Sequence, residues 1–288
     1  MGIDIHGLNL LQHARNKKKL DDTITIGRQC LNVIEPSVKE IIKVKSEYKH
    51  SSYCEELLQE YFGANKVQSL DNSAFEGATH IANMNEPLPQ NLVGKFDTVF
   101  DGGCLEHIYN VTQALKNYSL LCKAGGQIIH VLPANNFCGH GFYQFSPELF
   151  FSLYSQENGY DETEVFIADL SNTKQWYQVK KPENGERVNA TSSNALYVLV
   201  RTVLRVNEFN HTNVQQSDYI HDWAKASDNK EEKTQNYIRI KQIQKNIPFV
   251  YTLLYRIYHL ILRTRRKDRL NRKNPGLKLI RVKDLLVQ

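Results

Sequence analysis

The fold is decided by FDTVFDGGCLEHIYNVTQALKNYSLLCKAGG, residues 96–126, and by the QIIHVLP that follows at residues 127–133. The run from Phe96 to Phe100 is apolar and stops at an Asp-Gly-Gly turn, which predicts a buried strand. A helical pattern runs from about Ile108 to Cys122 and ends at Lys-Ala-Gly-Gly, and Gln127 to Leu132 forms a second apolar strand. A strand, a helix and a further strand in this order are typical of a parallel sheet with crossover helices.

The same alternation continues on both sides of this stretch. Upstream, the patterns predict strands over 23–26, 67–70 and 79–82 and helices over 6–19, 35–45 and 52–62. Downstream, Ser146-Pro147-Glu148 is a strong start for a helix that ends near Gln156. The late strands Glu164–Ile167 and Ala195–Val200 have no crossover helix between them, which favours an antiparallel pair. We therefore predict an α/β fold with a doubly wound, mostly parallel sheet and a late antiparallel strand pair.

Three regions differ in composition. Residues 1–205 carry the strand and helix pattern, and residues 206–247 are polar with little apolar periodicity, which predicts a linker. In residues 248–288, apolar side chains fall on one helical face and basic residues greatly outnumber acids. This last region is predicted to be a basic amphipathic helical extension, which lies either in the interface of an anionic membrane or against the body of the protein.

The composition excludes several classes of protein. The chain has 288 residues, 41% hydrophobic and 23% charged, with a net charge of +5, which is ordinary for a globular protein. Its five cysteines show no CxxC spacing, which argues against a disulfide framework and a zinc knuckle, and no metal-binding residues are predicted. No signal peptide or membrane-spanning run is visible. We expect a cytoplasmic protein, with a peripheral place on the inner face of the membrane as a further option.

An ordered series of short motifs carries a resemblance to a known family. The series is Phe96-Asp97, Leu105-Glu106-His107, the Lys-Ala-Gly-Gly turn at 123–126, GFYQFSPELF at 141–150, and Gly159-Tyr160. Over roughly residues 66–205 it resembles the class I S-adenosylmethionine-dependent methyltransferases, which have a Rossmann-like fold. The run at 141–150 looks most like bacterial methyltransferases associated with surface-polysaccharide or glycolipid synthesis.

The resemblance implies S-adenosylmethionine as the cofactor, bound at the carboxyl ends of the strands. Asp71 ends the second strand of the sheet, where it can accept hydrogen bonds from both ribose hydroxyls. Asn83 can accept from the adenine amine, with Met84 beside it for apolar contact. Asp101-Gly102-Gly103 ends the fourth strand, where bare backbone can approach the methionine part of the cofactor.

The chain departs from the family at the first strand. The family's glycine-rich loop reads roughly E-x-G-x-G-x-G, whereas the best candidate here is Gly27 followed by Arg28 and Gln29. We expect these three residues to contact the cofactor, with Arg28 or Gln29 as candidates for binding the methionine carboxylate.

The residues expected to carry catalysis follow the fourth and fifth strands. His107 is the first choice for the base that takes the acceptor's proton, because its ordinary pKa lies near neutrality. Glu106 is expected to orient it or to act as the alternative base. His140 and Tyr143 are expected to line the acceptor pocket. A structural role for His107, as a hydrogen-bond donor at a helix start, stays open.

The sequence therefore leads to one favoured function and two alternatives. The favoured function is methyl transfer to oxygen or nitrogen of a small-molecule or glycan acceptor, above all a sugar hydroxyl of a surface glycan or glycolipid. The first alternative is a catalytically inactive binding or assembly module, suggested by the missing glycines. The second is an RNA or protein methyltransferase guided by the basic tail. Nucleic-acid binding ranks low because the basic residues are confined to the tail, and the oligomeric state is left open.

Overall fold

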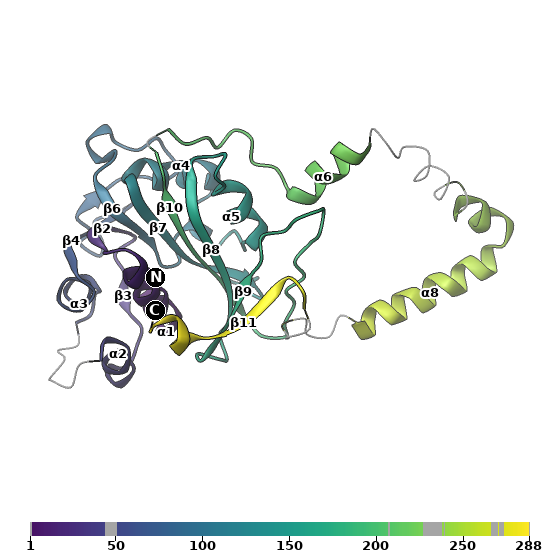
Figure 1. The fold of residues 1–288 in the computed structure, drawn as a ribbon, viewed down its shortest axis with the longest axis horizontal. Coiled ribbons are helices and arrows are strands. Elements are labelled where there is room, and N and C mark those ends of the chain that lie inside the picture. The colour runs from purple at the N-terminus through teal and green to yellow at the C-terminus, as the bar shows by residue number, and fades with distance from the viewer. Residues whose placement is uncertain are drawn as a thin grey trace.

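The computed structural model describes residues 2–43, 51–206, 208–226, 238, 240–265, 270 and 274–287. Its centre is a nine-stranded sheet with the strand order β11-β9-β8-β10-β7-β6-β2-β4-β5 (Figure 1). The strands are β2 (Asp21–Ile26), β4 (Ala64–Asp71), β5 (His80–Ile81), β6 (Phe96–Asp101), β7 (Cys122–Asn135), β8 (Tyr160–Asp169), β9 (Gln175–Val179), β10 (Leu196–Leu204) and β11 (Leu277–Arg281). A separate two-stranded sheet pairs β1 (Gly2–Ile3) with β3 (Cys30–Leu31).

The strand pairing confirms the predicted fold class. Strands β5, β4, β2, β6 and β7 pair in parallel, and the crossover order is that of a doubly wound sheet. Strand β10 then pairs antiparallel with both β7 and β8, so the predicted late antiparallel pair is confirmed as β8 and β10. Strand β9, which pairs antiparallel with β8, and the short strands β1 and β3 have no counterpart among the strands predicted from the sequence.

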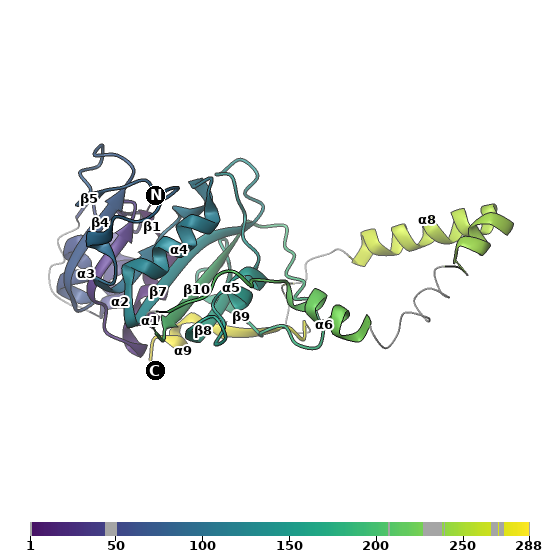
Figure 2. The same cartoon turned by 90° about the horizontal axis from the view of Figure 1, so that it is seen from above.

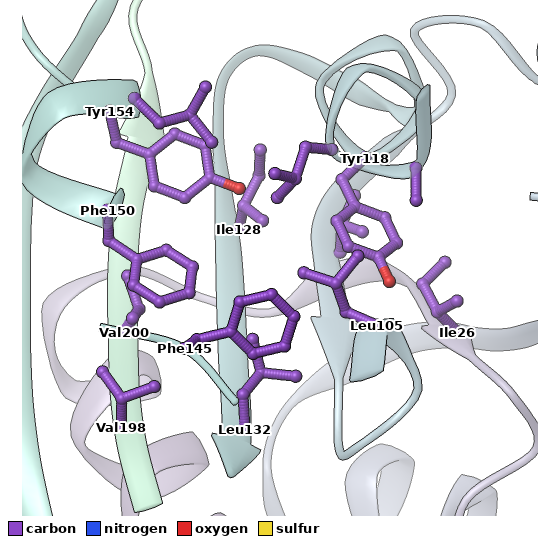
Figure 3. Close-up of a cluster of buried hydrophobic side chains, with 14 of the residues drawn as sticks. Ile26, Leu105, Tyr118, Ile128, Leu132, Phe145, Phe150, Tyr154, Val198 and Val200 are labelled. Carbon is purple, nitrogen blue, oxygen red and sulfur yellow. The ribbon is translucent and has the colours of Figure 1, made fainter. Parts of the chain in front are cut away.

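Helices cover both faces of the sheet. The helices are α1 (Ile5–Lys17), α2 (Glu35–Ile42), α3 (Glu55–Tyr61), α4 (Val111–Leu121), α5 (Pro147–Leu153), α6 (Ser217–Ala226), α8 (Pro248–Arg265) and α9 (Val282–Leu285), with 3₁₀ turns η1 (Gln90–Leu92) and η2 (Leu105–His107). One core packs α4 and α5 on the sheet, and Figure 3 shows the rings of Phe150 and Tyr154 beside Ile128 and Val200. The other core packs α1, α2, α3 and α9 on the opposite face.

Helix α1 differs from the expected amphipathic helix. Every residue from His6 to Ala14 is buried, including the polar Asn9, Gln12 and His13. Trp176 of β9 donates its indole N–H to His6 Nδ1 at 3.0 Å, and His13 Nε2 lies 3.0 Å from Glu164 Oε2. Helix α1 is therefore an internal element, and two of its four buried polar side chains, His6 and His13, have polar partners on distant strands.

The structure corrects the predicted C-terminal extension, which spans 248–288. Helix α8 begins at Pro248, as expected, but β11 returns to the sheet and pairs with β9 through Leu277↔Val179 and Ile280↔Trp176. Helix α9 then buries Val282 and Leu285 against the core that contains Trp176. The α/β body therefore includes residues 277–285, because their apolar side chains complete its core. The strand is only five residues long, so its sequence pattern did not predict it.

The connecting region is partly helical. The expected linker over 206–247 contains α6, whose Asp218 accepts a hydrogen bond from Arg187. Figures 1 and 2 show α6 and α8 projecting from the side of the body. Two residues of the predicted basic run at 265–267, Arg266 and Lys267, lie outside the described residues, as do residues 44–45 of the predicted second helix and residues 207, 227–237 and 239 of the linker.

The chain after β10 is fixed to the body by a half-buried histidine, His211. Tyr160 lies between Ser119 and His211, with its hydroxyl 2.6 Å from Ser119 Oγ and 2.7 Å from His211 Nε2. Burial lowers the pKa of His211 from its ordinary 6.5 to about 4. Protonation of His211 is therefore less favourable in the folded chain than in the unfolded chain. The contribution of neutral His211 to the free energy of unfolding is fully present above pH 6.5 and is lost as the pH falls from 6.5 towards 4.

This yields a pH prediction. When the pH is lowered from 7 to roughly 4.5, protonation of His211 should reduce the free energy of unfolding by about 2 kcal/mol. This value allows for the partial exposure of the side chain. Urea unfolding of wild type and His211→Gln at both pH values measures the difference. The variant should lose that much less on acidification, whereas His259→Gln, on exposed α8, should behave as wild type. Equal losses in wild type and His211→Gln would contradict the assignment.

Candidate functional site

The carboxyl ends of three parallel strands bring the predicted site residues together. In the sheet register, Ile26 of β2 lies opposite Leu70 of β4 and Asp101 of β6, and Asp71 lies opposite Ile81 of β5. Two cavities open at this edge, with volumes of about 240 and 220 Å³. Of the described residues, His107 alone lines both. Each cavity is below the usual size of a small-molecule site, and the two adjoin at His107.

The larger of the two, the Asp71 cavity, contains the predicted nucleoside-binding residues. Asp71, Asn83 and Met84 line it, together with Ile26, Leu70, Asn72, Ala82, Asn85, Cys104, His107 and Ile108. Asp71 Oδ1 accepts the backbone N–H of Ser73 at 3.2 Å, and Asn83 Oδ1 accepts the backbone N–H of Asn85 at 3.0 Å. These turn hydrogen bonds hold both side chains at the ends of β4 and β5. Burial raises the pKa of the Cys104 thiol well above its ordinary value. A thiol that stays protonated is a poor nucleophile, so Cys104 has a packing role.

The loop after β2 lies apart from both cavities. Arg28 donates to Glu55 Oε1 and to the carbonyl of Glu76, both at 2.7 Å, and its guanidinium lies 3.9 Å from the centre of the Tyr53 ring. The Gln29 side chain is fully buried and donates to the carbonyl of Ile26 at 2.7 Å. Neither residue lines a cavity, so the structure does not place them with the other predicted cofactor residues.

Gly27 and Gly102 explain how the loop packs. Gly27 has φ +71°, and its N–H donates to the carbonyl of Leu70 at 2.7 Å, which turns the chain sharply at the end of β2. A Cβ on Gly102 would lie 2.6 Å from Gln29 Oε1. That amide oxygen has no hydrogen-bond partner among the described residues. The Gln29 side chain thus fills the space between the ends of β2 and β6.

The second cavity, the Glu106 cavity, contains all three predicted catalytic residues. Glu106, His107 and His140 line it with Gly102 and Gly103, and its remaining lining residues are Gly2, Asp4, Asn32, Val131, Pro133 and Tyr197. The last six are not among the predicted site residues. The parallel pairing of β1 with β3 brings Gly2 and Asn32 to this edge, and no local motif in the sequence marks that contact.

Glu106, His107 and His140 form a compact cluster. Glu106 Oε1 lies 3.4 Å from His140 Nε2 and 3.9 Å from His107 Nε2, and the two imidazole rings are 4.9 Å apart between centres. The Glu106 side chain is only 2% exposed, whereas the two histidines are about half exposed. Burial, with a contribution from Asp101, raises the pKa of Glu106 to about 8. Burial also lowers the pKa of His107, and the nearby His140 lowers it further.

Asp101 faces the core and not the cavities. Its Oδ1 accepts the backbone N–H of Cys104 at 2.7 Å, and its Oδ2 accepts the Tyr118 hydroxyl at 3.0 Å and lies 3.4 Å from His130 Nδ1. His130 Nε2 lies 2.7 Å from the Tyr154 hydroxyl. All these side chains are buried, so Asp101 anchors the turn before the site and does not line either cavity.

Tyr143, which was expected to line the acceptor pocket, lines neither of the two cavities. Its hydroxyl donates to the carbonyl of Tyr109 at 2.8 Å, which joins the loop after β7 to the segment before α4. A larger cavity, of about 910 Å³, lies elsewhere, between α9, β8, β9 and β11, and contains none of the predicted site residues.

Comparisons with solved structures give distant likenesses. An S-adenosylmethionine-dependent methyltransferase from Thermotoga maritima is 17% identical, with a TM-score of 0.34 over 69% of this chain and 91% of that one. The YcgJ protein of Bacillus subtilis is 9% identical, with a TM-score of 0.38 over 69% and 99%. The branched-chain polyamine synthase of Thermus thermophilus, in complex with N4-aminopropylspermidine and 5′-methylthioadenosine, is 14% identical, with a TM-score of 0.38 over 74% and 61%.

No protein-family model matches the chain, and no curated protein matches it. With identities and TM-scores this low, the conclusions about this protein rest on its own sequence and geometry.

Proposed function

We propose that this protein transfers a methyl group from S-adenosylmethionine to an oxygen or nitrogen atom of an acceptor. The observation that carries the proposal is the pair of cavities that meet at His107, at the carboxyl ends of the parallel strands. One offers Asp71, Asn83 and Met84, and the other offers Glu106 and His140. A two-part site of this kind suits a nucleoside cofactor on one side and an acceptor on the other.

The Asp71 cavity fits the nucleoside half of the cofactor. Asp71 Oδ1 holds the turn, and no described residue donates a hydrogen bond to Oδ2, which leaves that oxygen for the ribose hydroxyls. Asn83 lines the same cavity, and its Oδ1 can accept from the adenine amine by exchanging the hydrogen bond that the Asn85 side-chain amide donates to it at 2.9 Å, while Met84 and Ile108 supply apolar contact. The bound cofactor would supply the methyl group on a sulfonium centre.

The Glu106 cavity would hold the acceptor. His107 lies where the two cavities meet, so its imidazole can take the proton from an acceptor hydroxyl as the new bond to carbon forms. The lowered pKa of His107 keeps the ring neutral and ready to accept that proton near pH 7. The buried Glu106 carboxyl lies 3.9 Å from His107 Nε2, close enough to stabilise the imidazolium that forms when the ring takes the proton.

A sugar hydroxyl is the proposed acceptor. The exposed rings of Tyr109 and Phe142 pack edge to face, 6.4 Å apart between centres, next to the segments that carry His107 and His140. Exposed aromatic rings beside a polar cavity offer a flat apolar surface for the carbon face of a sugar ring. This placement agrees with the resemblance of residues 141–150 to methyltransferases of surface-glycan synthesis.

Calorimetric titration of the purified chain with S-adenosylmethionine and S-adenosylhomocysteine tests the proposal. We expect binding in the micromolar range, about −8 kcal/mol. Asp71→Ala should weaken it by about 1.5–3 kcal/mol, because hydrogen bonds from the ribose to a carboxylate are lost. Asn72→Ala, a change in the adjacent residue of the same cavity, is the matched control and should bind as wild type. If Asp71→Ala bound the cofactor with wild-type affinity, the proposal that Asp71 binds the ribose would be wrong.

A non-catalytic binding module is the second candidate, and one observation favours it. The Gln29 side chain fills the space above Gly102 where the family has a bare glycine-rich loop. If the folded chain binds neither S-adenosylmethionine nor S-adenosylhomocysteine in the same titration, the result favours a non-catalytic binding module.

We also propose a peripheral membrane location on the cytoplasmic face. Helix α8 exposes a row of apolar side chains, among them Phe249, Leu253 and Leu260. None of the helices within the described residues is long and apolar enough to cross a membrane. The chain should sediment with vesicles that contain anionic lipid, and the triple variant Phe249→Ser, Leu253→Ser, Leu260→Ser should stay in solution. Equal sedimentation of the two proteins would refute an interfacial role for α8.

A further inference from the structure

We propose that Glu106, His107 and His140 bind one divalent transition-metal ion, with Zn²⁺ as the best fit. The site stands on the geometry of these three side chains and does not depend on methyl transfer. Its role in holding an acceptor, developed below, does rest on the proposed function. The chain contains no spacing of cysteines or histidines that predicts such a site, because His140 is 33 positions beyond His107.

The spacing of the donor atoms fits a metal ion. Zinc ligands lie at about 2.0–2.2 Å, so two ligand atoms at a tetrahedral angle are about 3.4 Å apart. Glu106 Oε1 lies 3.4 Å from His140 Nε2 and 3.9 Å from His107 Nε2. One ligand atom from each of the three residues can be chosen so that all lie within 4.8 Å of one another. Small rotations of two half-exposed imidazoles are enough to close this set around one ion.

A second observation is the unsatisfied carboxyl oxygen. Glu106 Oε2 is buried and has no hydrogen-bond partner among the described residues, although the side chain lines the cavity. Buried carboxyl oxygens in native proteins are almost always paired, so one without a partner requires an explanation. A metal ion held by this carboxyl group would supply the missing positive partner.

The backbone holds the three ligands in place. The carbonyl of Glu106 accepts the N–H of Phe142 at 2.7 Å and that of Tyr143 at 3.3 Å, which fastens the loop that carries His140 over Glu106. Gly141 has φ +70°, and a Cβ there would lie 2.8 Å from the Glu106 carbonyl oxygen. Only glycine permits this approach, so the loop is shaped to bring His140 to the carboxyl group.

The ligand set indicates the kind of metal and leaves room for a substrate. Two histidines and one carboxylate are the protein ligands of many catalytic zinc sites, and the same set binds iron(II). The carboxyl group closes one side of the cluster, whereas the half-exposed histidines leave a fourth position towards the cavity of about 220 Å³. In the proposed reaction that position would take the acceptor hydroxyl, which would lose its proton more readily on a cation, with the proton passing to solvent water on the exposed side of the two histidines. His107 then acts as a ligand and no longer as the base.

The test is a metal titration of the full chain without cofactor or acceptor. The protein is first freed of metal with a chelator and then titrated with Zn²⁺ by calorimetry and with Co²⁺ by visible absorption. We expect one equivalent to bind, with Co²⁺ absorption that indicates nitrogen and oxygen ligands. Glu106→Gln and His140→Asn should each weaken binding by at least about tenfold, since even the loss of an outer-shell partner has that effect. Zn²⁺ should raise the melting temperature of the wild type and of neither variant.

Two matched controls keep the result specific. Cys138→Ala removes the exposed thiol closest in sequence to His140, and His259→Asn removes an exposed histidine on α8, so both should bind the metal as wild type. His140 is half exposed, so its variant should fold normally even if Glu106→Gln does not. Wild-type affinity in His140→Asn, or no binding by the folded wild-type chain, overturns the proposal. The separate cofactor titration decides the proposed function, so either can fail without the other.

Discussion

His107→Asn is expected to lower kcat for methyl transfer by about 10²–10⁴-fold, the usual contribution of a positioned acid–base group. His107 is the one described residue that lines both cavities, so it lies where the methyl group and the acceptor must meet. The loss is expected whether the imidazole takes the acceptor's proton or holds a metal ion, because both roles use Nε2. Asparagine keeps a polar side chain at the position but can do neither.

The measurement is the rate of S-adenosylhomocysteine formation with the best acceptor from a screen that begins with sugars. Affinity for S-adenosylmethionine, determined by calorimetry on the same variant, should change far less than kcat. His259→Asn, on α8, serves as the matched control and should keep wild-type activity. Full activity in His107→Asn would remove this residue from the catalytic machinery and leave it a structural role at the end of η2.

Trp176→Ala is expected to reduce the free energy of unfolding by about 3–5 kcal/mol. Trp176 is fully buried, its ring centre lies 5.6 Å from that of Phe166, and its N–H donates to His6 Nδ1. The substitution therefore opens a large cavity and leaves the buried His6 without its donor. A domain of this kind has only about 5–15 kcal/mol of stability in total, so the loss is a large fraction of it.

The second tryptophan provides the control. Trp223 lies on α6 and is 59% exposed, so Trp223→Ala should change stability by less than about 0.5 kcal/mol. Urea unfolding followed by far-UV circular dichroism measures both variants. Because Trp176 lies opposite Ile280 in the sheet, its loss should also expose the C-terminal strand to limited proteolysis. If Trp176→Ala and Trp223→Ala proved equally stable, the description of α1 and β11 as packed around Trp176 would be wrong.

The parallel part of the sheet could be predicted from the sequence because its signals are local. Strand patterns that stop at Asp71 and Asp101, with helical patterns between the strands, indicate parallel strands, which need crossover connections. All strands of this kind end at the same edge of the sheet. For that reason the sequence predicts that Asp71, Asn83 and His107 lie near one another, and in the structure all three line one cavity.

Interactions between segments that are distant in the sequence could be identified only from the tertiary structure. Arg28 was a reasonable candidate for binding a carboxylate, but the fold places Glu55 and the carbonyl of Glu76 within its reach. The same holds for β11, which follows the region after α8 and pairs with β9 nearly a hundred residues earlier in the chain.

The sequence by itself determined the fold class, and it predicted fewer than half of the residues that line each of the two cavities at the carboxyl edge of the sheet. The tertiary structure alone decided that Asp4 and Tyr197 reach the Glu106 cavity, that α1 is buried, and that His140 lies 3.4 Å from Glu106. The physical reason is the range of the interactions. Strand and helix patterns reflect neighbours two to four positions away, whereas these contacts depend on how whole elements pack and which distant side chains the packing brings within hydrogen-bonding distance.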